Sequence, residues 1–340
     1  MIERRTVGRS GLQVSAMTLG TMTFCTVGPY GRIGATPSEM SRVVETALDA
    51  GIDTFDTANV YGDGESERVL GQLLGKRRSS VVIATKIRFP MDHSGERPPA
   101  NAYGLSRSGI IRAVDDSLRR LDTEWIDLLQ LHMQDRLVPI EETLSATDDL
   151  VRAGKVRYVG VSNYTAYRLV EALWVADKRD LDPIVSVQLP WSLVGRDAER
   201  ELVPAARHFR LGLIVYSPLA RGFLTGKYRR GEDPPEGSRL KEWREELAEA
   251  STEHNWKVLE SVRELASRRE TSPAAVSLAW ALRKPGVSSV VVGARTSEQL
   301  KENLAGAALK LSTDEVRQLD EVSQPVWGYP YDFIRRFEPW

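Results

Sequence analysis

The sequence predicts an α/β fold of the (β/α)8 type, a TIM barrel, from three observations. Short apolar runs alternate along the chain with longer amphipathic segments, there are eight such runs, and no change in composition divides the 340 residues. Buried strands without polar alternation are typical of a parallel sheet covered by helices. Because a doubly wound sheet of this size would usually leave a domain break, we expect a single barrel domain over residues 1–340.

The predicted strands are short segments rich in valine, isoleucine and leucine. In chain order they cover residues 16–20, 52–56, 81–86, 127–132, 156–162, 184–189, 213–217 and 289–293. Two of the intervening helices have clear starts. Residues 36–39 (TPSE) match a capping box with proline at the first helical position, and Pro273 repeats that proline before another helical pattern.

Segments outside the strands complete the predicted architecture. A turn around Ser10 and Gly11 precedes the first strand and predicts an N-terminal β-hairpin that covers the barrel floor. Loops rich in proline and glycine at residues 89–106 and 218–250 interrupt the alternation. Loops of this length in a compact domain are typically functional, so we expect them at the C-terminal face, where such barrels carry out their chemistry.

Polar or aromatic side chains lie at the carboxyl ends of the predicted strands, at that face. Burying a carboxylate is costly unless a cation pairs with it, so Asp56 at the end of the second strand predicts a cationic partner. Lys86, at the end of the third strand, is the candidate. The later strands contribute His132, Ser162 with Asn163, Gln188 and Tyr216. We expect all of them to point into one cleft.

Tyr61 follows Asp56 closely and gives this group an acid. A phenol titrates near pH 10, so it becomes a better proton donor only if a cation such as the Lys86 ammonium stabilises its phenolate. His132 can hydrogen-bond a carbonyl oxygen as negative charge develops on it. None of these side chains is an obvious nucleophile. The predicted chemistry is therefore protonation of a carbonyl oxygen while a cofactor delivers hydride to the carbon.

The chain resembles the aldo-keto reductases, in particular the branch that includes bacterial general reductases and β subunits of voltage-gated potassium channels. The resemblance runs from RTVGRSGLQVSAMTLGTMTF to VVGARTSEQLKENLAGA, nearly the whole chain. The segments FDTANVYG, VIATK and LLQLHMQD imply that Asp56, Tyr61, Lys86 and His132 form a catalytic tetrad. The resemblance also implies NADPH or NADP+ bound across the barrel mouth without a Rossmann domain, consistent with the lack of a G-x-G-x-x-G motif.

The resemblance implies a set of cofactor-binding residues as well. The nicotinamide end is bound by Gly20, Thr21, Met22, Asp56, Ser162, Asn163, Gln188 and Tyr216, the last stacking on the ring. The pyrophosphate is bound by Ser217, Pro218, Leu219, Arg221, Gly222 and Lys227, and the adenosine end by Gly293, Arg295, Gln299, Glu302 and Asn303. This last segment opens a helix, whose free N–H groups favour a phosphate. Arg295, Lys227 and Arg239 supply charge for a 2′-phosphate, which favours NADPH over NADH.

The expected substrate is an aldehyde or ketone, keto-sugars included. The segment 25–36 is longer than the glycine turn usual in the family, and the segment after Lys86 is equally individual, so both should border the substrate. Phe24, Phe89 and Trp191 are expected to form an apolar or sugar-stacking wall. The aromatic tail at residues 326–340 either folds over the cleft or mediates a subunit contact, and the sequence leaves both open.

Composition excludes other classes of partner. With 46 basic and 47 acidic residues the net charge is -1, so we expect neither nucleic acid nor an anionic membrane as a partner. We expect neither a signal peptide nor a transmembrane span, and the one cysteine, Cys25, fits a reducing compartment, so we expect a cytoplasmic protein. Its four histidines lack metal-ligand spacing, and no metal site is expected.

Two rival functions and the oligomeric state stay open. Channel β subunits in the family imply an NADPH-binding regulatory or sensor subunit as one alternative. A lysine at a barrel strand end is also where Schiff-base aldolases keep their nucleophile, so Lys86 suggests a second alternative. Asp56 argues against the aldolase, because an ion pair keeps the amine protonated.

Overall fold

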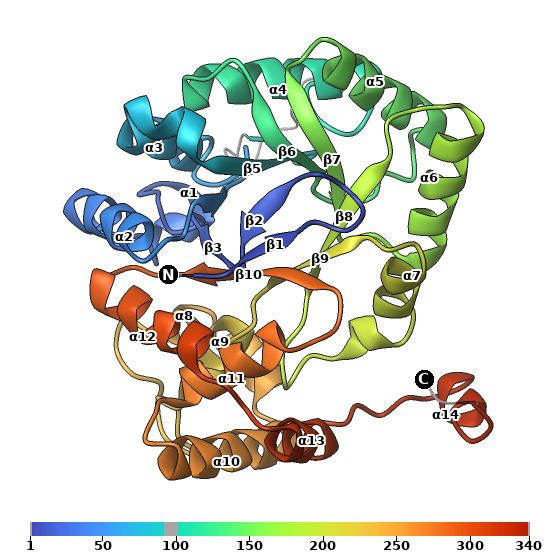
Figure 1. Ribbon diagram of the computed structural model, residues 1–340. Helices are drawn as coiled ribbons and strands as arrows, with labels where there is room; N and C mark the ends of the chain where they lie inside the picture. The colour runs from blue at the N-terminus through green and yellow to red at the C-terminus, as the bar shows by residue number, and fades with distance from the viewer. Residues whose placement is uncertain (1, 92–100, 339–340) are drawn as a thin grey trace.

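The computed structural model describes residues 2–91 and 101–338. Within these residues, eight parallel strands close into a barrel in the order β10-β3-β4-β5-β6-β7-β8-β9 (Figure 1). They are β3 (Met17–Gly20), β4 (Thr54–Asp56), β5 (Val82–Ile87), β6 (Ile126–Leu131), β7 (Val156–Ser162), β8 (Ile184–Pro190), β9 (Gly212–Tyr216) and β10 (Val287–Gly293). The predicted TIM barrel is confirmed, and every strand boundary lies within two residues of its predicted place.

Helices form a ring outside the barrel (Figure 1). Those that connect or cover the strands are α2 (Pro37–Asp49), α3 (Glu65–Leu74), α4 (Arg107–Leu121), α5 (Ile140–Arg152), α6 (Ala166–Lys178), α7 (Leu202–His208), α10 (Glu253–Arg268), α11 (Pro273–Leu282), α12 (Ser297–Ala308) and α13 (Thr313–Val322). Helix α2 shows why they pack on the sheet: Met40, Val43, Val44 and Ala47 are buried at the spacing of one helix face.

The predicted helix starts are present, but the capping box at residues 36–39 is only half formed. Thr36 caps α2 by accepting a hydrogen bond from the backbone N–H of Glu39. The Glu39 carboxylate does not return to Thr36; it pairs with Arg42 at 2.7 Å and accepts the backbone N–H of Ser297 at 3.3 Å. Glu39 therefore links α2 to the first turn of α12, a tertiary contact that the local pattern did not predict.

The N-terminal hairpin covers the floor of the barrel, as predicted. Strands β1 (Arg4–Thr6) and β2 (Gln13–Ser15) pair antiparallel, and Val7, Leu12 and Val14 pack on inward-facing residues of the barrel such as Val185. The fit is close at Gly8, whose φ is +56°. A Cβ there would lie 2.7 Å from backbone atoms of residues 210 and 212.

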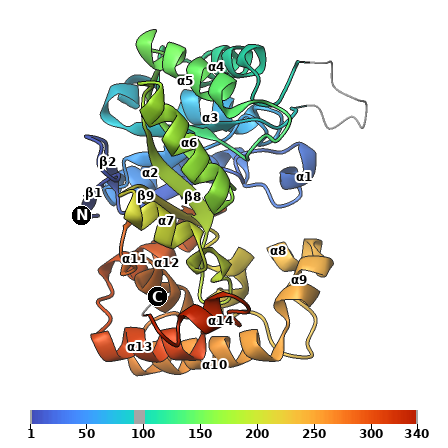
Figure 2. The same ribbon diagram turned by 90° about the vertical axis from the view of Figure 1, so that its right-hand side faces the viewer.

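The loops of the opposite end carry short helices. Figure 2 shows α1 (Gly28–Gly31), α8 (Arg239–Glu242) and α9 (Arg244–Ala250) at the end of the barrel away from the hairpin. The remaining short elements are η1 (Gly75–Ser80), η2 (Asp197–Glu199), η3 (Ala220–Thr225) and α14 (Tyr331–Ile334). In the long loop at 89–106, residues 92–100 lie outside the described residues. Among the described residues, no helix is both long and apolar enough to cross a membrane.

The aromatic tail lies against the outside of the barrel. Arg200 donates to the carbonyl of Val326, and the Tyr331 hydroxyl donates to Glu201 at 2.7 Å. Up to residue 338, where the described chain ends, the tail contributes no residue to the cavity at the barrel mouth. Of the two alternatives that the sequence left open, folding over the cleft is wrong for the described part of the tail, because these polar contacts hold it at Arg200 and Glu201, just before α7.

Candidate active site

The carboxyl ends of the strands open into a cavity of about 820 Å³. Of the residues predicted as tetrad or cofactor contacts, all but Thr21 and Lys86 line it. The parallel ladder explains why they meet. Gly20 lies beside Asp56, Lys86 beside Gln130, and Ser162 beside Gln188, so neighbouring strand ends present their side chains at one level.

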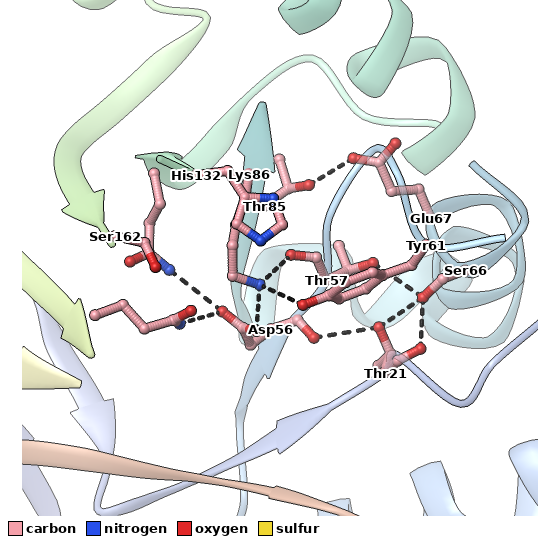
Figure 3. A network of polar contacts seen from close by, with 12 residues as sticks. Thr21, Asp56, Thr57, Tyr61, Ser66, Glu67, Thr85, Lys86, His132 and Ser162 are labelled. Atoms are coloured by element: carbon pink, nitrogen blue, oxygen red, sulfur yellow. Dashed lines mark hydrogen bonds and ion pairs between the residues drawn. The ribbon is translucent and has the colours of Figure 1, made fainter. Parts of the chain in front are cut away.

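Asp56 and Lys86 form the predicted ion pair beneath the cavity (Figure 3). The Lys86 ammonium donates to a carboxylate oxygen of Asp56 at 2.6 Å and to the carbonyl of Thr57 at 2.8 Å. Lys86 is only 1% exposed. Burial on its own lowers the pKa of Lys86, but Asp56 and Tyr61 outweigh it, and the pKa is raised above its usual range. The ammonium therefore stays charged although it is buried.

Two buried carboxamides hold the other oxygen of Asp56. The side-chain NH2 of Gln188 donates to it at 2.7 Å and that of Gln130 at 3.3 Å. The resemblance assigned Gln188 to the cofactor alone. Sequence reasoning missed Gln130, although a glutamine inside the apolar run of β6 was a usable signal, since a polar side chain at such a position needs a buried partner.

Tyr61 places its hydroxyl 3.3 Å from the Lys86 ammonium (Figure 3). Burial is the largest influence and raises the pKa of Tyr61, while the charge of Lys86 acts in the opposite direction. Lys86 stabilises the phenolate as expected, but desolvation of the phenolate outweighs this one nearby cation, and the net pKa is raised. At neutral pH the phenol therefore holds its proton and remains a donor.

His132 follows β6 and packs edge to face on Tyr61 in the cavity wall. The ring centroids are 6.1 Å apart and the planes nearly perpendicular. Burial, followed by the charges of Lys86 and Arg88, keeps the pKa of His132 well below 6.5, so the imidazole is neutral at pH 7. Its buried Nδ1 has no hydrogen-bond partner among the described residues. A neutral imidazole keeps one N–H, which can donate to a carbonyl oxygen in the cavity.

A hydroxyl cluster of Thr21, Thr57 and Ser66 supports this group from behind. Ser66 Oγ lies 2.8 Å from the Thr21 hydroxyl and 3.0 Å from the Thr57 hydroxyl, and it donates to the Thr21 carbonyl at 2.7 Å (Figure 3). The backbone N–H of Ser66 donates to the carbonyl of Tyr61 at 3.3 Å. Thr21 is fully buried and does not line the cavity, which corrects its assignment as a cofactor contact.

A second buried network, formed around Glu67, fixes the start of α3. The carboxylate of Glu67 has no exposed surface and accepts from the Thr85 hydroxyl at 2.5 Å (Figure 3). It also accepts from Arg120 Nε at 2.7 Å. Thr85 precedes Lys86 on β5, so it points to the opposite side of that strand. Ser66 and Glu67 together anchor the loop that carries Tyr61 to strands β3, β4 and β5.

The cavity wall beyond His132 is built from β7 and β9. The Tyr216 hydroxyl donates to the side-chain oxygen of Asn163 at 2.8 Å, and the Asn163 amide donates to the carbonyl of His132 at 2.9 Å. Asn163 has a φ of +54°, which is uncommon for a residue with a side chain. This chain of contacts fixes the flat Tyr216 side chain at the cavity, as a ring-stacking surface requires.

The next segment combines an unusual backbone with positive charge. Ser217, Ala220, Arg221 and Gly222 all have positive φ, between +46° and +95°. Backbone in such conformations can turn N–H groups toward one anion. The cations that line this part of the cavity are Arg221, Lys227, Arg239 and Arg295. Burial and the charge of Arg295 lower the pKa of Lys227, so positive charge is concentrated here in a chain whose net charge is only -1.

The first turn of α12 differs from the expectation of free N–H groups. The Ser297 N–H bonds to Glu39, the Gln299 N–H to the Thr296 hydroxyl, and the Arg295 N–H to the Gln299 side chain. The protein itself therefore satisfies most donors at this helix start. An anion at this end of the cavity would depend on the Arg295 and Lys227 side chains more than on the helix terminus.

None of the three members of the predicted substrate wall lines the cavity. Phe24 has no exposed surface, and Trp191 is buried against Trp280 with its indole N–H bonded to Glu199 at 2.8 Å. Both pack in the core, and neither lines the cavity. Phe89 lies 5.0 Å from the His132 ring. Tyr30, Ile33, Trp243 and Glu246, which sequence reasoning did not single out, line the cavity instead.

Comparison with known proteins places this geometry in a family. The model of the aldo/keto reductase family matches residues 16–324. An uncharacterized oxidoreductase of Bacillus subtilis is 37% identical, covering 93% of this chain and 94% of its own length. A candidate voltage-gated potassium channel subunit beta of Schizosaccharomyces pombe is also 37% identical, over 94% and 92%. The versiconal hemiacetal acetate reductase of Aspergillus parasiticus is 34% identical, over 97% and 99%.

These matches extend over nearly the whole barrel, and they include the strand ends that form the cavity. The family consists of oxidoreductases that generally use NAD(P)H. The chain therefore belongs to the aldo/keto reductase family.

Proposed function

We propose that this protein is an NADPH-dependent reductase that converts an aldehyde or ketone into an alcohol, with Tyr61 as the proton donor. One observation carries the proposal: a single buried ammonium, Lys86, contacts both the Asp56 carboxylate and the Tyr61 hydroxyl at the edge of the cavity. A lysine placed in this way supports the transfer of a proton from a phenol that is otherwise a weak acid at pH 7.

The residues present fit a nicotinamide dinucleotide. Tyr216, Asn163 and Gln188 would hold the nicotinamide, and the positive-φ segment at residues 217–222 with Lys227 would hold the pyrophosphate. Arg239 has a buried Nε with no hydrogen-bond partner among the described residues, a donor suited to an anion. With Arg295 it would bind the 2′-phosphate, which favours NADPH. The reduced nicotinamide supplies the hydride that adds to the carbonyl carbon.

The side chains of the protein supply the one proton that the reduction requires. Tyr61 donates its hydroxyl proton to the carbonyl oxygen, and the phenolate that remains is stabilised by the Lys86 ammonium 3.3 Å away. Asp56 keeps Lys86 charged, and Gln130 and Gln188 hold Asp56 in place. Neutral His132 donates its N–H to the same carbonyl oxygen and orients it. One hydride and one proton convert the carbonyl into the alcohol.

A second candidate function is a regulatory subunit that senses NADPH. The relative from Schizosaccharomyces pombe named for a potassium channel supports it, because that protein is as similar to this chain as the oxidoreductase from Bacillus subtilis. An aldolase mechanism at Lys86 is disfavoured, because a raised pKa leaves little free amine to attack a carbonyl. As further parts of the proposal, the partner is a small carbonyl compound rather than nucleic acid or a membrane, and the protein is cytoplasmic.

The test is Tyr61→Phe. We expect the variant to fold and to bind NADPH, but to lose about 10² to 10⁴ of its kcat for carbonyl reduction, because only the proton donor is removed. The absorbance of the reduced nicotinamide measures turnover on aldehydes, ketones and keto-sugars. Retained activity would mean that another group is the acid. If the unaltered protein binds NADPH yet reduces no member of the panel, the regulatory function replaces the reductase.

A further inference from the structure

Exposed apolar side chains gather in two patches on the surface of the protein. Among the described residues, ten large apolar side chains are at least 38% exposed, and eight of them lie on α6, on the loop beside it or in the C-terminal tail. Single exposed apolar residues are normal on a protein surface, but clusters of them indicate an interaction surface. The α6 patch consists of Leu137, Tyr167, Val170 and Trp174, and the tail patch of Val326, Tyr329, Phe333 and Phe337.

The α6 patch is a second apolar face on a helix that already covers the barrel. Tyr167, Val170 and Trp174 follow one another at spacings of three and four residues, so they form one stripe along the helix. Arg168 donates to two backbone carbonyls of the loop after β6, at 3.0 and 3.1 Å, which holds Leu137 beside this helix. The buried residues of α6 lie on the opposite side of the helix and are Leu169, Ala172, Val175 and Ala176.

The tail patch lies on the same side of the molecule but does not cover the α6 patch. Arg200 and the Tyr331 hydroxyl fix the tail to the segment just before α7. Helix α7 lies between α6 and α14 in both views (Figure 1, Figure 2). Phe333 and Phe337 pack on each other, with ring centroids 5.3 Å apart, yet they are 54% and 74% exposed. Within one copy of the chain, both patches are therefore open to a partner.

We propose that the two patches form a two-fold interface between two copies of this chain, in which the tail of each copy packs on α6 of the other. This is the second alternative that the sequence left open for the tail, a subunit contact. Both patches face the same way, so a second copy covers both at once only if it faces the first. A two-fold axis near α7 then brings each patch against its complement in the other copy.

The size and composition of the two patches fit a stable interface. Together they expose on the order of 1,000 Å² per copy, which is comparable with the roughly 800 Å² per partner that a specific interface buries. Five of the eight side chains are aromatic, and aromatic residues are enriched in interface cores. None of the eight lines the cavity, so the interface does not depend on the proposed function.

The first test is the mass of the protein in solution. Sedimentation velocity of the unaltered protein should give twice the mass of one chain, with a dissociation constant of about 1 µM or tighter. Trp174→Glu and Phe333→Lys should each weaken association at least about 100-fold, because symmetry places the new charge in both halves of the interface. Both variants should keep the circular dichroism of the unaltered protein, since both positions are exposed. Tyr103→Glu, which changes an exposed ring outside both patches, is the matched control and should stay dimeric.

A mixture of the two variants tests which patch meets which. In a dimer of one Trp174→Glu chain and one Phe333→Lys chain, both substitutions fall in the same contact between α6 and the tail, where their opposite charges meet. The other contact is unaltered. The mixed dimer should therefore form at least about tenfold more tightly than a dimer of either variant alone, as measured by native mass spectrometry.

Four results would overturn the inference. They are an unaltered protein that stays monomeric at about 100 µM, far above the expected dissociation constant, a dimer that neither variant weakens, and a mixture that associates no better than each variant alone. The fourth is a series of assemblies that grow beyond the dimer with concentration, because a head-to-tail contact produces open chains whereas a two-fold contact closes.

Discussion

The cavity has a floor, formed by Asp56, Thr57, Tyr61 and Lys86, and a rim that includes Tyr30 and Trp243. These two regions are built in opposite ways. At the floor, Lys86 is 1% exposed and bonds to Asp56, Thr57 and Tyr61 within 3.3 Å. At the rim, Trp243 and Tyr30 are half-buried, come from loops and contact one another only ring to ring. A substitution at the floor would leave a buried polar group without its partner, whereas residues at the rim can be substituted one at a time without disturbing the barrel.

The difference has a physical origin in the backbone. Floor residues extend from a closed ladder in which Asp56 lies beside both Gly20 and Ala84, so their positions are fixed by hydrogen bonds on either side. Other residues that line the cavity belong to segment 217–222, where positive φ values take the place of a strand ladder. We therefore expect substitutions of the buried ion pair Asp56–Lys86 to affect catalysis and folding together, and substitutions at the rim to affect ligand choice alone.

We expect the largest effect on stability and activity from Lys86→Met, which removes the cation from the floor of the cavity. This variant leaves Asp56 as a buried charge without its cation, so the free energy of unfolding should fall by about 3–5 kcal/mol. Its kcat should fall by at least about 10²-fold, because the phenolate of Tyr61 loses its stabilising charge. Urea denaturation and steady-state kinetics measure the two effects.

The control for that variant is Arg77→Ala, which breaks an exposed ion pair with Glu45 and should lower the free energy of unfolding far less than Lys86→Met does. Adding Asp56→Leu to Lys86→Met should restore part of the stability but none of the activity, because it removes the unpaired charge without restoring the cation. A Lys86→Met protein as stable as the unaltered one would contradict the description of the floor as a coupled unit.

We expect an intermediate effect from Arg295→Ala, which removes one of the cations that line the cavity. Loss of one guanidinium should weaken NADPH binding about tenfold while changing NADH binding little, because only NADPH carries the 2′-phosphate. Stability should not change, in contrast to Lys86→Met. Fluorescence titration with both cofactors measures the dissociation constants, and Arg317→Ala, on the exposed face of α13, serves as the control. Equal dissociation constants in the unaltered protein would refute the prediction.

The smallest effect concerns the pH dependence of stability at His132. The pKa of His132 is lowered, so below pH 6.5 the unfolded chain takes up a proton that the folded protein does not. Stability is therefore present above pH 6.5 and is lost as the pH falls, by at most about 1.4 kcal/mol per pH unit. His132→Gln should flatten this acid slope between pH 7 and 5.5 in urea denaturation. An identical slope in both proteins would show that the imidazole titrates freely in the folded state.

The barrel, the hairpin and the pairing of Asp56 with Lys86 follow from the amino-acid sequence alone. Each of these depends on local pattern and on one general rule. Apolar runs specify strands, and the ends of parallel strands in a barrel lie at one face, so residues that close the runs must be neighbours. The paired charges followed from the cost of burying either charge alone.

The orientation of particular side chains, and the groups that surround them, depend on how the folded chain packs. Phe24 and Trp191 turn into the core, and Glu39 leaves its own helix for the start of α12. The pKa of Tyr61 rises because burial outweighs Lys86, a balance that no local pattern contains. Tyr30 meets Trp243 because two loops far apart in the chain cross the same mouth. Such contacts depend on the packing of distant segments, and spacing along one segment does not encode it.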